Sequence, residues 1–157
     1  MTAATADLQK FQKFLKNGMP GQHAYVVLLG LSQFDWPGII KRIEKGLPYS
    51  AFERLQKNTR VSSDQLRDLL QIPRRTLARR KTAGVLNAEE SDRLVRLARV
   101  YARTLYFFDG DAEAATEWLT DAQYSFGGVP PIEMARTDVG AQEVERLIGQ
   151  LEHGVFP

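Results

Sequence analysis

The chain has 157 residues and a formal net charge of +2; 43% of its residues are hydrophobic and 25% are charged, as in an ordinary globular protein. It contains no cysteine, which excludes a disulfide framework, a thiolate zinc site and a cysteine nucleophile. The longest apolar run, residues 24–31, is far shorter than the ~20 residues that cross a bilayer. Because no secretory signal precedes it, we expect a cytoplasmic protein without a membrane partner.

Charge is unevenly distributed along the chain. Residues 71–81 contain five basic side chains and no acidic one, whereas residues 109–121 contain five acidic side chains and no basic one. This asymmetry indicates two surfaces with different partners, although two solvated helix faces explain it equally well.

The first sixty residues contain several short helical patterns. Residues 6–16 carry apolar side chains at helical spacing, and we expect this helix to end near Gly18. Residues 24–31 fit either a strand or a buried helix. The sequence Trp-Pro-Gly at 36–38 predicts the start of a short helix that stops at Gly46, and Pro-Tyr-Ser at 48–50 precedes another.

Two short helices are predicted next, joined by a tight turn. Ser62 and Gln65 form a capping-box pair that begins the first helix, which we expect to end at Gln71. Pro73 is tolerated in the first position of the second helix, where its missing N–H is not needed. The second helix is strongly basic and stops at Gly84.

Residues 62–82 therefore have the layout of a helix-turn-helix, in which the second helix lies in the major groove of DNA. If Leu77 faces the first helix, Arg75 and Arg79 point away from it, and arginine suits bidentate contact with guanine. The neighbouring basic side chains suit phosphates. The alternative is a basic surface helix in an ordinary bundle. The predicted DNA-binding residues are Arg74, Arg75, Thr76, Arg79, Arg80, Lys81 and Thr82.

The longest predicted helix, residues 88–108, begins at a second capping box formed by Asn87 and Glu90. Its apolar stripe is wide, which predicts a dimer interface, although burial within the chain remains an equal alternative. Arginines on the opposite side, between residues 93 and 103, are interpreted as a solvated face rather than a phosphate-binding surface. The predicted dimer-interface residues are Leu94, Leu97, Ala98, Tyr101, Leu105 and Phe108.

The C-terminal third is predicted to contain an acidic helix at 112–120, a loop at 127–131 and an amphipathic helix at 138–153. Thr137 is the expected N-cap of the last helix and Gly154 its C-cap. We therefore expect an all-α fold with three parts. These are a helical N-terminal region over residues 1–86 that contains the helix-turn-helix, dimerisation helices over 87–122, and a small helical C-terminal segment over 123–157.

Evidence for catalysis is poor. The two histidines, His23 and His153, lie far apart in sequence and lack the spacing of a metal site. No serine elbow and no phosphate-binding glycine loop is present. We expect neither enzymatic activity, nor a cofactor, nor a bound metal.

Two longer stretches carry a family resemblance. The first is RRTLARRKTAGVLNAEESDRLVRLARVYARTLYFF at 74–108, which is followed by Glu-Trp-Leu at 117–119. The second is GGVPPIEMARTDVGAQEVERLIGQLEHGVF at 127–156. Together they resemble antitoxins of the MbcA/ParS/Xre group. The similarity points in particular to the Xre antitoxins of RES–Xre toxin–antitoxin modules, and it covers about residues 50–157.

The resemblance implies an all-helical homodimer that represses its own operon by binding operator DNA. It also implies that a C-terminal domain binds a RES-type toxin, which degrades NAD, and that the C-terminal end obstructs the active-site pocket of the toxin. Carried onto this chain, the toxin-binding residues closest to that pocket are Glu152, His153, Gly154, Val155 and Phe156.

Two other classes of function remain open at this point. The first is a helix-turn-helix transcriptional regulator whose C-terminal domain senses a small molecule. Such a domain needs a cavity with converging polar groups, and the C-terminal pattern leaves little room to enclose a ligand. The second is a small helical enzyme, for which the sequence offers no site.

Overall fold

The computed structural model describes residues 5–18 and 23–155, and in these ranges it contains α-helices and short 3-10 helices but no sheet. The predicted all-α fold is thereby confirmed. The α-helices are α1 (Ala6–Asn17), α2 (Trp36–Lys45), α3 (Tyr49–Thr59), α4 (Ser63–Leu69), α5 (Arg74–Ala83), α6 (Ala88–Phe107), α7 (Ala112–Thr120), α8 (Pro131–Met134) and α9 (Asp138–Glu152), and the 3-10 helices are η1 (Ala24–Leu29) and η2 (Tyr124–Phe126).

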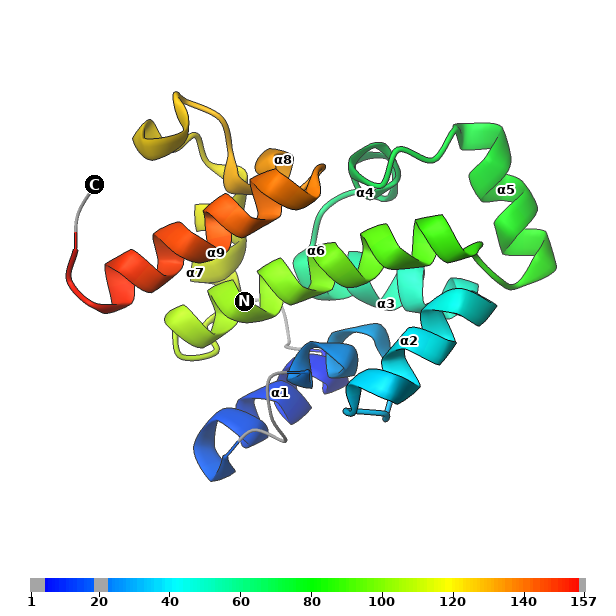
Figure 1. The fold of residues 1–157 in the computed structure, drawn as a ribbon, viewed down its shortest axis with the longest axis horizontal. Helices are drawn as coiled ribbons and strands as arrows, with labels where there is room; N and C mark the ends of the chain where they lie inside the picture. The colour runs from blue at the N-terminus through cyan, green and yellow to red at the C-terminus, as the bar shows by residue number, and fades with distance from the viewer. Residues whose placement is uncertain (1–4, 19–22, 156–157) are drawn as a thin grey trace.

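Helix α6 is the axis of the fold. It packs most extensively against η1 on one side and α9 on the other, and α2 and α7 also contact it. In Figure 1 α5 lies beside the N-terminal end of α6, whereas the C-terminal ends of α1, α6 and α9 lie together at the opposite end of the molecule. With 20 residues and a rise of about 1.5 Å per residue, α6 separates these two ends by about 30 Å.

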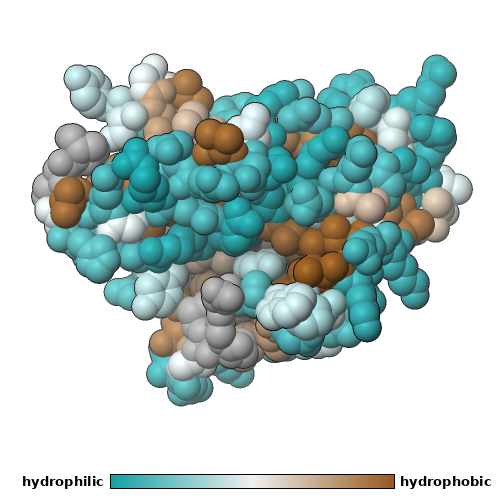
Figure 2. Space-filling view, in the orientation of Figure 1, coloured by the Kyte–Doolittle hydropathy of each residue, from teal (hydrophilic) through white to brown (hydrophobic). Residues whose placement is uncertain are grey.

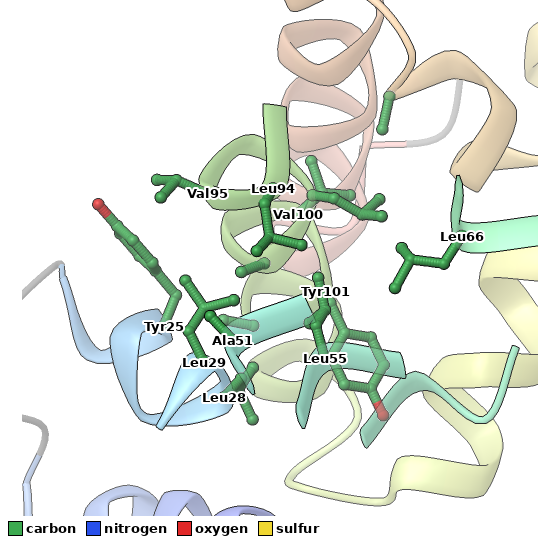
Figure 3. Packing of buried hydrophobic residues seen from close by; sticks show 14 of the residues in the cluster. Tyr25, Leu28, Leu29, Ala51, Leu55, Leu66, Leu94, Val95, Val100 and Tyr101 are labelled. Atoms are coloured by element: carbon green, nitrogen blue, oxygen red, sulfur yellow. The ribbon is translucent and has the colours of Figure 1, made fainter. Parts of the chain in front are cut away.

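The apolar stripe of α6 lies in the core of the single chain (Figure 3). The phenol of Tyr101 is buried and donates a hydrogen bond to the Asn58 carbonyl at 2.7 Å. This burial contradicts the reason for predicting a dimer interface here, because elements of the same chain cover the stripe. The residues concerned are Leu94, Leu97, Ala98, Tyr101 and Leu105, which are buried, and Phe108, which is partly buried and packs against this core.

The run at 24–31, which fitted a strand or a buried helix, forms the 3-10 helix η1, and all six of its residues are buried. It ends at Gly30, whose φ of 73° lies in the left-handed region. A Cβ at this glycine would lie 2.6 Å from the end of the Arg54 side chain, which would have to shift to make room for it. Glycine at position 30 thus serves both the turn and the packing.

Helix α1 is fastened to this region by a polar cluster. Arg54 donates two hydrogen bonds to the Asp7 carboxylate, at 3.0 and 2.5 Å, and Asn58 donates a third at 3.0 Å. Burial by itself would raise the pKa of Asp7, but the hydrogen bonds from Arg54 and Asn58 and the nearby positive charge hold it below its ordinary value. The N-terminal helix is therefore part of the folded unit.

The predicted helix ends are mostly confirmed. The capping box of Asn87 and Glu90 is complete, and α5 ends at Gly84 in a left-handed conformation. Helix α4 ends earlier than predicted, because Gln71 adopts a left-handed conformation with φ of 56°. Pro73 is the N-cap of α5 rather than its first residue.

The C-terminal helix closes with a glycine motif. Thr137 caps its start as predicted, but its last cap is His153, one residue before the predicted Gly154. Gly154 follows with φ of 71°, and the backbone N–H groups of Gly154 and Val155 bond to the carbonyls of Leu151 and Gln150. This is the pattern of a Schellman ending, which makes the glycine conformation a requirement.

Residues 127–131 were predicted as loop, and the structure shows one additional element there. Pro131 begins the short helix α8, in a first-turn position that suits a residue without an N–H. The face of the molecule in Figure 2 is mainly hydrophilic, with a larger apolar patch where Figure 1 places α2 beside α6.

Candidate functional site

Helix α5 stands at one end of the molecule with only Leu77 buried among its ten residues. Leu77 joins the core, and Ile72 in the preceding turn is buried as well. The orientation predicted from Leu77 is therefore the one observed, and the opposite side of the helix faces solvent.

The exposed side of α5 is basic and largely free of carboxylate partners. Within the described residues, Arg75, Arg79 and Lys81 form no ion pair with an acidic side chain. Arg74 pairs with Asp64 at 3.7 Å, and this pair is weak because the distance is long and both side chains are exposed. Of the other predicted DNA-binding residues, Thr76 accepts a hydrogen bond from Arg79 at 3.3 Å and Thr82 is exposed.

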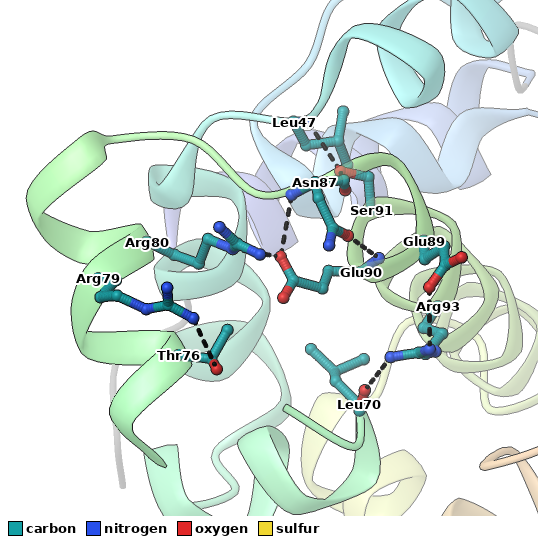
Figure 4. A network of polar contacts seen from close by, with 10 residues as sticks. All are labelled: Leu47, Leu70, Thr76, Arg79, Arg80, Asn87, Glu89, Glu90, Ser91 and Arg93. Carbon is teal, nitrogen blue, oxygen red and sulfur yellow. Dashed lines mark hydrogen bonds and ion pairs between the residues drawn. The ribbon is translucent and has the colours of Figure 1, made fainter. Parts of the chain in front are cut away.

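Arg80 differs from the other basic residues of α5. Its Nε donates to Glu90 Oε1 at 2.7 Å, and the same carboxylate oxygen accepts the Asn87 backbone N–H at 2.9 Å (Figure 4). The Glu90 side chain is only 6% exposed. Arg80, predicted as a phosphate contact, therefore also ties α5 to the capping box of α6.

The turn between α4 and α5 is held from the C-terminal part of the chain. Gln71 donates its side-chain N–H to the Arg136 carbonyl at 3.1 Å. The guanidinium of Arg136 donates in turn to the Asp68 carboxylate of α4 at 2.8 Å, and this contact raises the pKa of Arg136. The helix-turn-helix and the α8–α9 junction are thus in direct contact.

The first half of the arginine face of α6 contacts backbone carbonyls of other segments. Arg93 donates to the Leu70 carbonyl at 3.1 Å, and Arg96 donates to the Arg136 carbonyl at 3.2 Å. These bonds hold the helix-turn-helix and the α8–α9 junction against α6. The interpretation of this face as simply solvated is wrong in this half.

The second half of that face pairs with α9. Arg99 donates to Glu145 at 2.7 Å, and Arg103 donates two hydrogen bonds to Glu152 at 2.5 and 2.6 Å. Hydrogen bonding to Glu152 raises the pKa of Arg103 despite the opposing effect of burial. Sequence separation hid these pairs, since the partners lie 46 and 49 residues apart.

Four of the five predicted toxin-facing residues, those at 152–155, lie at the far end of α6 from α5. Glu152 is held by Arg103, whereas His153 and Gly154 are exposed. Val155 is 53% exposed, although it is apolar. Phe156, the last predicted contact, lies outside the described residues.

In the ranges 5–18 and 23–155, no cluster of three or more potential ligands is placed to hold a metal ion. Within the same ranges, no helix has the length and apolar character to span a membrane.

Two protein families match consecutive parts of the chain. Residues 38–99 match the antitoxin Xre-like helix-turn-helix domain, which includes α4 and α5. Residues 102–154 match the antitoxin Xre/MbcA/ParS C-terminal toxin-binding domain, which begins within α6 and includes α7 to α9. The first matched region contains α5, and the second contains the C-terminal end of α9.

Individual relatives match over most of their length. The chain is 32% identical over 129 residues to an antitoxin Xre from Yersinia enterocolitica, covering 82% of this chain and 87% of that protein. It is 29% identical over 128 residues to an antitoxin Xre from Photorhabdus laumondii, covering 81% and 86%. It is also 26% identical over 142 residues to a Prs ADP-ribosylating antitoxin from a Sphingobium species, covering 85% and 87%.

Proposed function

We propose two functions for this chain, which belongs to the Xre antitoxin family. It neutralises a RES-type toxin that degrades NAD, and it represses the operon that encodes both proteins. The proposal assigns no catalytic role and no cofactor to the chain. In this account the C-terminal end blocks the active-site pocket of the toxin, and α5 reads operator DNA in the major groove.

The observation that carries the proposal is the placement of two unlike surfaces at opposite ends of α6. At one end, the exposed arginines of α5 match the bidentate contacts that arginine makes with guanine. At the other end, the chain leaves Val155 exposed beyond the last helix. An exposed apolar residue beyond the end of a helix suits insertion into the pocket of a partner, because few contacts of the fold depend on it.

Operator binding as a homodimer is part of the proposal, because helix-turn-helix proteins place two reading helices on two half-sites. The α6 stripe is covered by its own chain, so this homodimer would use another surface. A small-molecule sensor is less favoured, since residues 102–154 match a domain described by its binding to a toxin.

A second candidate partner comes from the Sphingobium relative, whose name specifies an ADP-ribosylating system. Such a toxin also consumes NAD but attaches ADP-ribose to a protein. The two candidates differ in product, because a degrading enzyme lowers total NAD without labelling a protein target.

Expression of the reading frame next to this chain in its operon, with and without the chain, tests the proposal. We expect that frame alone to stop growth and deplete cellular NAD, and co-expression of this chain to restore both. ADP-ribosylated protein on blots would instead identify the second candidate. Growth arrest that this chain does not relieve would contradict the antitoxin function.

A further inference from the structure

A groove of about 590 Å³ lies at the end of the molecule remote from α5. Three helices supply its walls: α1, the C-terminal end of α6 and the C-terminal end of α9. Its lining residues are Leu15, Tyr106, Phe107, Asp109, Leu151 and Glu152. The groove therefore combines an element outside both matched families with elements of the toxin-binding domain.

Helix α1 is fixed in this position by contacts to the α6–α7 turn. Gln12 donates its side-chain N–H to the Gly110 carbonyl at 3.0 Å. A Cβ at Gly110 would lie 3.1 Å from the Leu15 side chain and 3.0 Å from that of Gln12, so the helix packs closely on the turn. The wall that α1 contributes is therefore built into the fold.

The groove has both apolar and polar lining, and its most exposed aromatic residue is Tyr106. Tyr106 is 51% exposed, and the Arg103 guanidinium lies 5.8 Å from its ring centroid. The same guanidinium donates to both carboxylate oxygens of Glu152, so Tyr106, Arg103 and Glu152 lie next to one another. An exposed aromatic side chain of this kind is a common anchor in protein interfaces.

Charge identifies the chemistry of the occupant. Both charged residues that line the groove are acidic; Glu152 is paired with Arg103, whereas Asp109 is exposed and forms no ion pair within the described residues. A partner segment with an apolar side chain flanked by lysine or arginine complements this surface.

We propose that the toxin docks in this groove through such a segment, and that α1 is part of the toxin-binding surface. The inference rests on the proposed antitoxin function and adds a second contact to the one made by the C-terminal end. It assigns a role to a helix that the toxin-binding domain does not include.

The test measures binding of the full-length chain to a purified, catalytically inactivated form of the toxin encoded beside it, by calorimetry. Tyr106→Ala and Leu15→Ala each remove one apolar wall, and we expect each to weaken binding about tenfold. Asp109→Asn removes only the charge, since asparagine tolerates the left-handed conformation at this position, where φ is 53°. We expect it to weaken binding mainly at low salt.

Matched controls lie outside the groove. Val139→Ala truncates an apolar side chain that is 70% exposed on α9, and Asp121→Asn removes an exposed carboxylate. Both should bind the toxin like the unaltered chain. A photo-reactive phenylalanine analogue in place of Tyr106 should crosslink to the toxin, whereas the same group in place of Val139 should not.

The outcomes separate the two proposals. Failure of the unaltered chain to bind the toxin would overturn both. Tight binding that the Tyr106 and Leu15 variants retain, with unchanged melting temperatures, would overturn the groove and leave the antitoxin function standing. A crosslink from position 106 to the last residues of its own chain, rather than to the toxin, would likewise overturn it.

Discussion

On α5, Arg75 and Arg79 are exposed and have no carboxylate partner among the described residues, whereas on α6, Arg99 and Arg103 each donate to a glutamate of α9. Both helices are rich in arginine, and neither sequence by itself shows which will be paired. The difference lies in what packs alongside: α9 supplies carboxylates to α6, whereas the outer side of α5 faces solvent.

This comparison separates two uses of arginine in one small fold. The arginines of α6 connect distant segments and position the C-terminal domain. Arg75 and Arg79 of α5 have no carboxylate partner among the described residues, and in the proposed function their guanidinium groups contact DNA.

The largest expected effect on stability concerns Arg80. It lies on α5, but like the arginines of α6 it is paired with a carboxylate of another helix, that of Glu90. Its removal leaves the nearly buried Glu90 carboxylate with an unpaired charge, which typically costs about 3–5 kcal/mol. Since 27% of the Arg80 side chain is exposed, we expect Arg80→Ala to lower the free energy of unfolding by about 2–3 kcal/mol. Chemical denaturation measures this, with Arg79→Ala as the control, which should change stability by less than about 0.5 kcal/mol. Equal effects of both variants would remove the distinction.

Next in size are the effects of the two arginines that are proposed to read DNA. Arg75→Ala and Arg79→Ala should each weaken binding to the operator by about 1–3 kcal/mol and relax sequence preference at one position. Lys81→Ala should instead weaken binding to all sequences alike and reduce the salt dependence. Fluorescence anisotropy with operator and unrelated duplexes distinguishes these patterns. If both arginine variants retain full operator affinity, α5 does not read DNA.

A smaller effect is expected for the pair that joins α6 to α9. Arg103→Gln removes two charge-assisted hydrogen bonds at a partly exposed site, and we expect a loss of about 1 kcal/mol in unfolding free energy. Arg146→Gln is the matched control, since Arg146 is 62% exposed and pairs only with Glu143 one turn away. It should cost about 0.3 kcal/mol or less. Thermal melts compare the two variants. If Arg103→Gln and Arg146→Gln lowered the stability equally, the α6–α9 pairs would not hold the C-terminal helix.

The smallest effect concerns acid stability and the N-terminal helix. The pKa of Asp7 lies below its ordinary value of 3.8, so as pH falls the unfolded chain takes up the proton before the folded chain does. The stability contributed by Asp7 is therefore complete above about pH 4 and decreases as pH falls through the lowered pKa. Asp7→Asn should reduce this dependence in urea unfolding measured between pH 3 and 6. An unchanged slope would exclude Asp7 as its source.

Local signals made much of this fold predictable from sequence. Side-chain caps such as Asn87 and Thr137, and stop signals such as Gly46 and Gly84, are short-range features, and the helices begin or end close to them. The exposed side of α5 was predictable because one inward residue, Leu77, fixes the orientation of a short helix.

The remaining features depend on contacts between segments far apart in the chain. An arginine on a helix face reads as solvated until its partner is known, and Glu152 lies 49 residues beyond Arg103. In the same way, a wide apolar stripe predicts that a helix face is buried. It does not show whether a second copy of the chain covers that face or, as here, η1 and α9 of the same chain do. The groove was missed because Leu15 and Leu151 come from opposite ends of the sequence.

The central claim is that the two functions reside at the two ends of α6 and can be lost independently. One experiment compares the double variant Arg75→Ala/Arg79→Ala with a deletion of residues 154–157, which leaves the Arg103–Glu152 pair intact. Operator binding and protection against the co-expressed toxin are measured for both. We predict that the double variant still protects but does not bind the operator, and that the deletion binds the operator but does not protect. Loss of both activities in either variant, with an unchanged circular dichroism melt, would contradict the account.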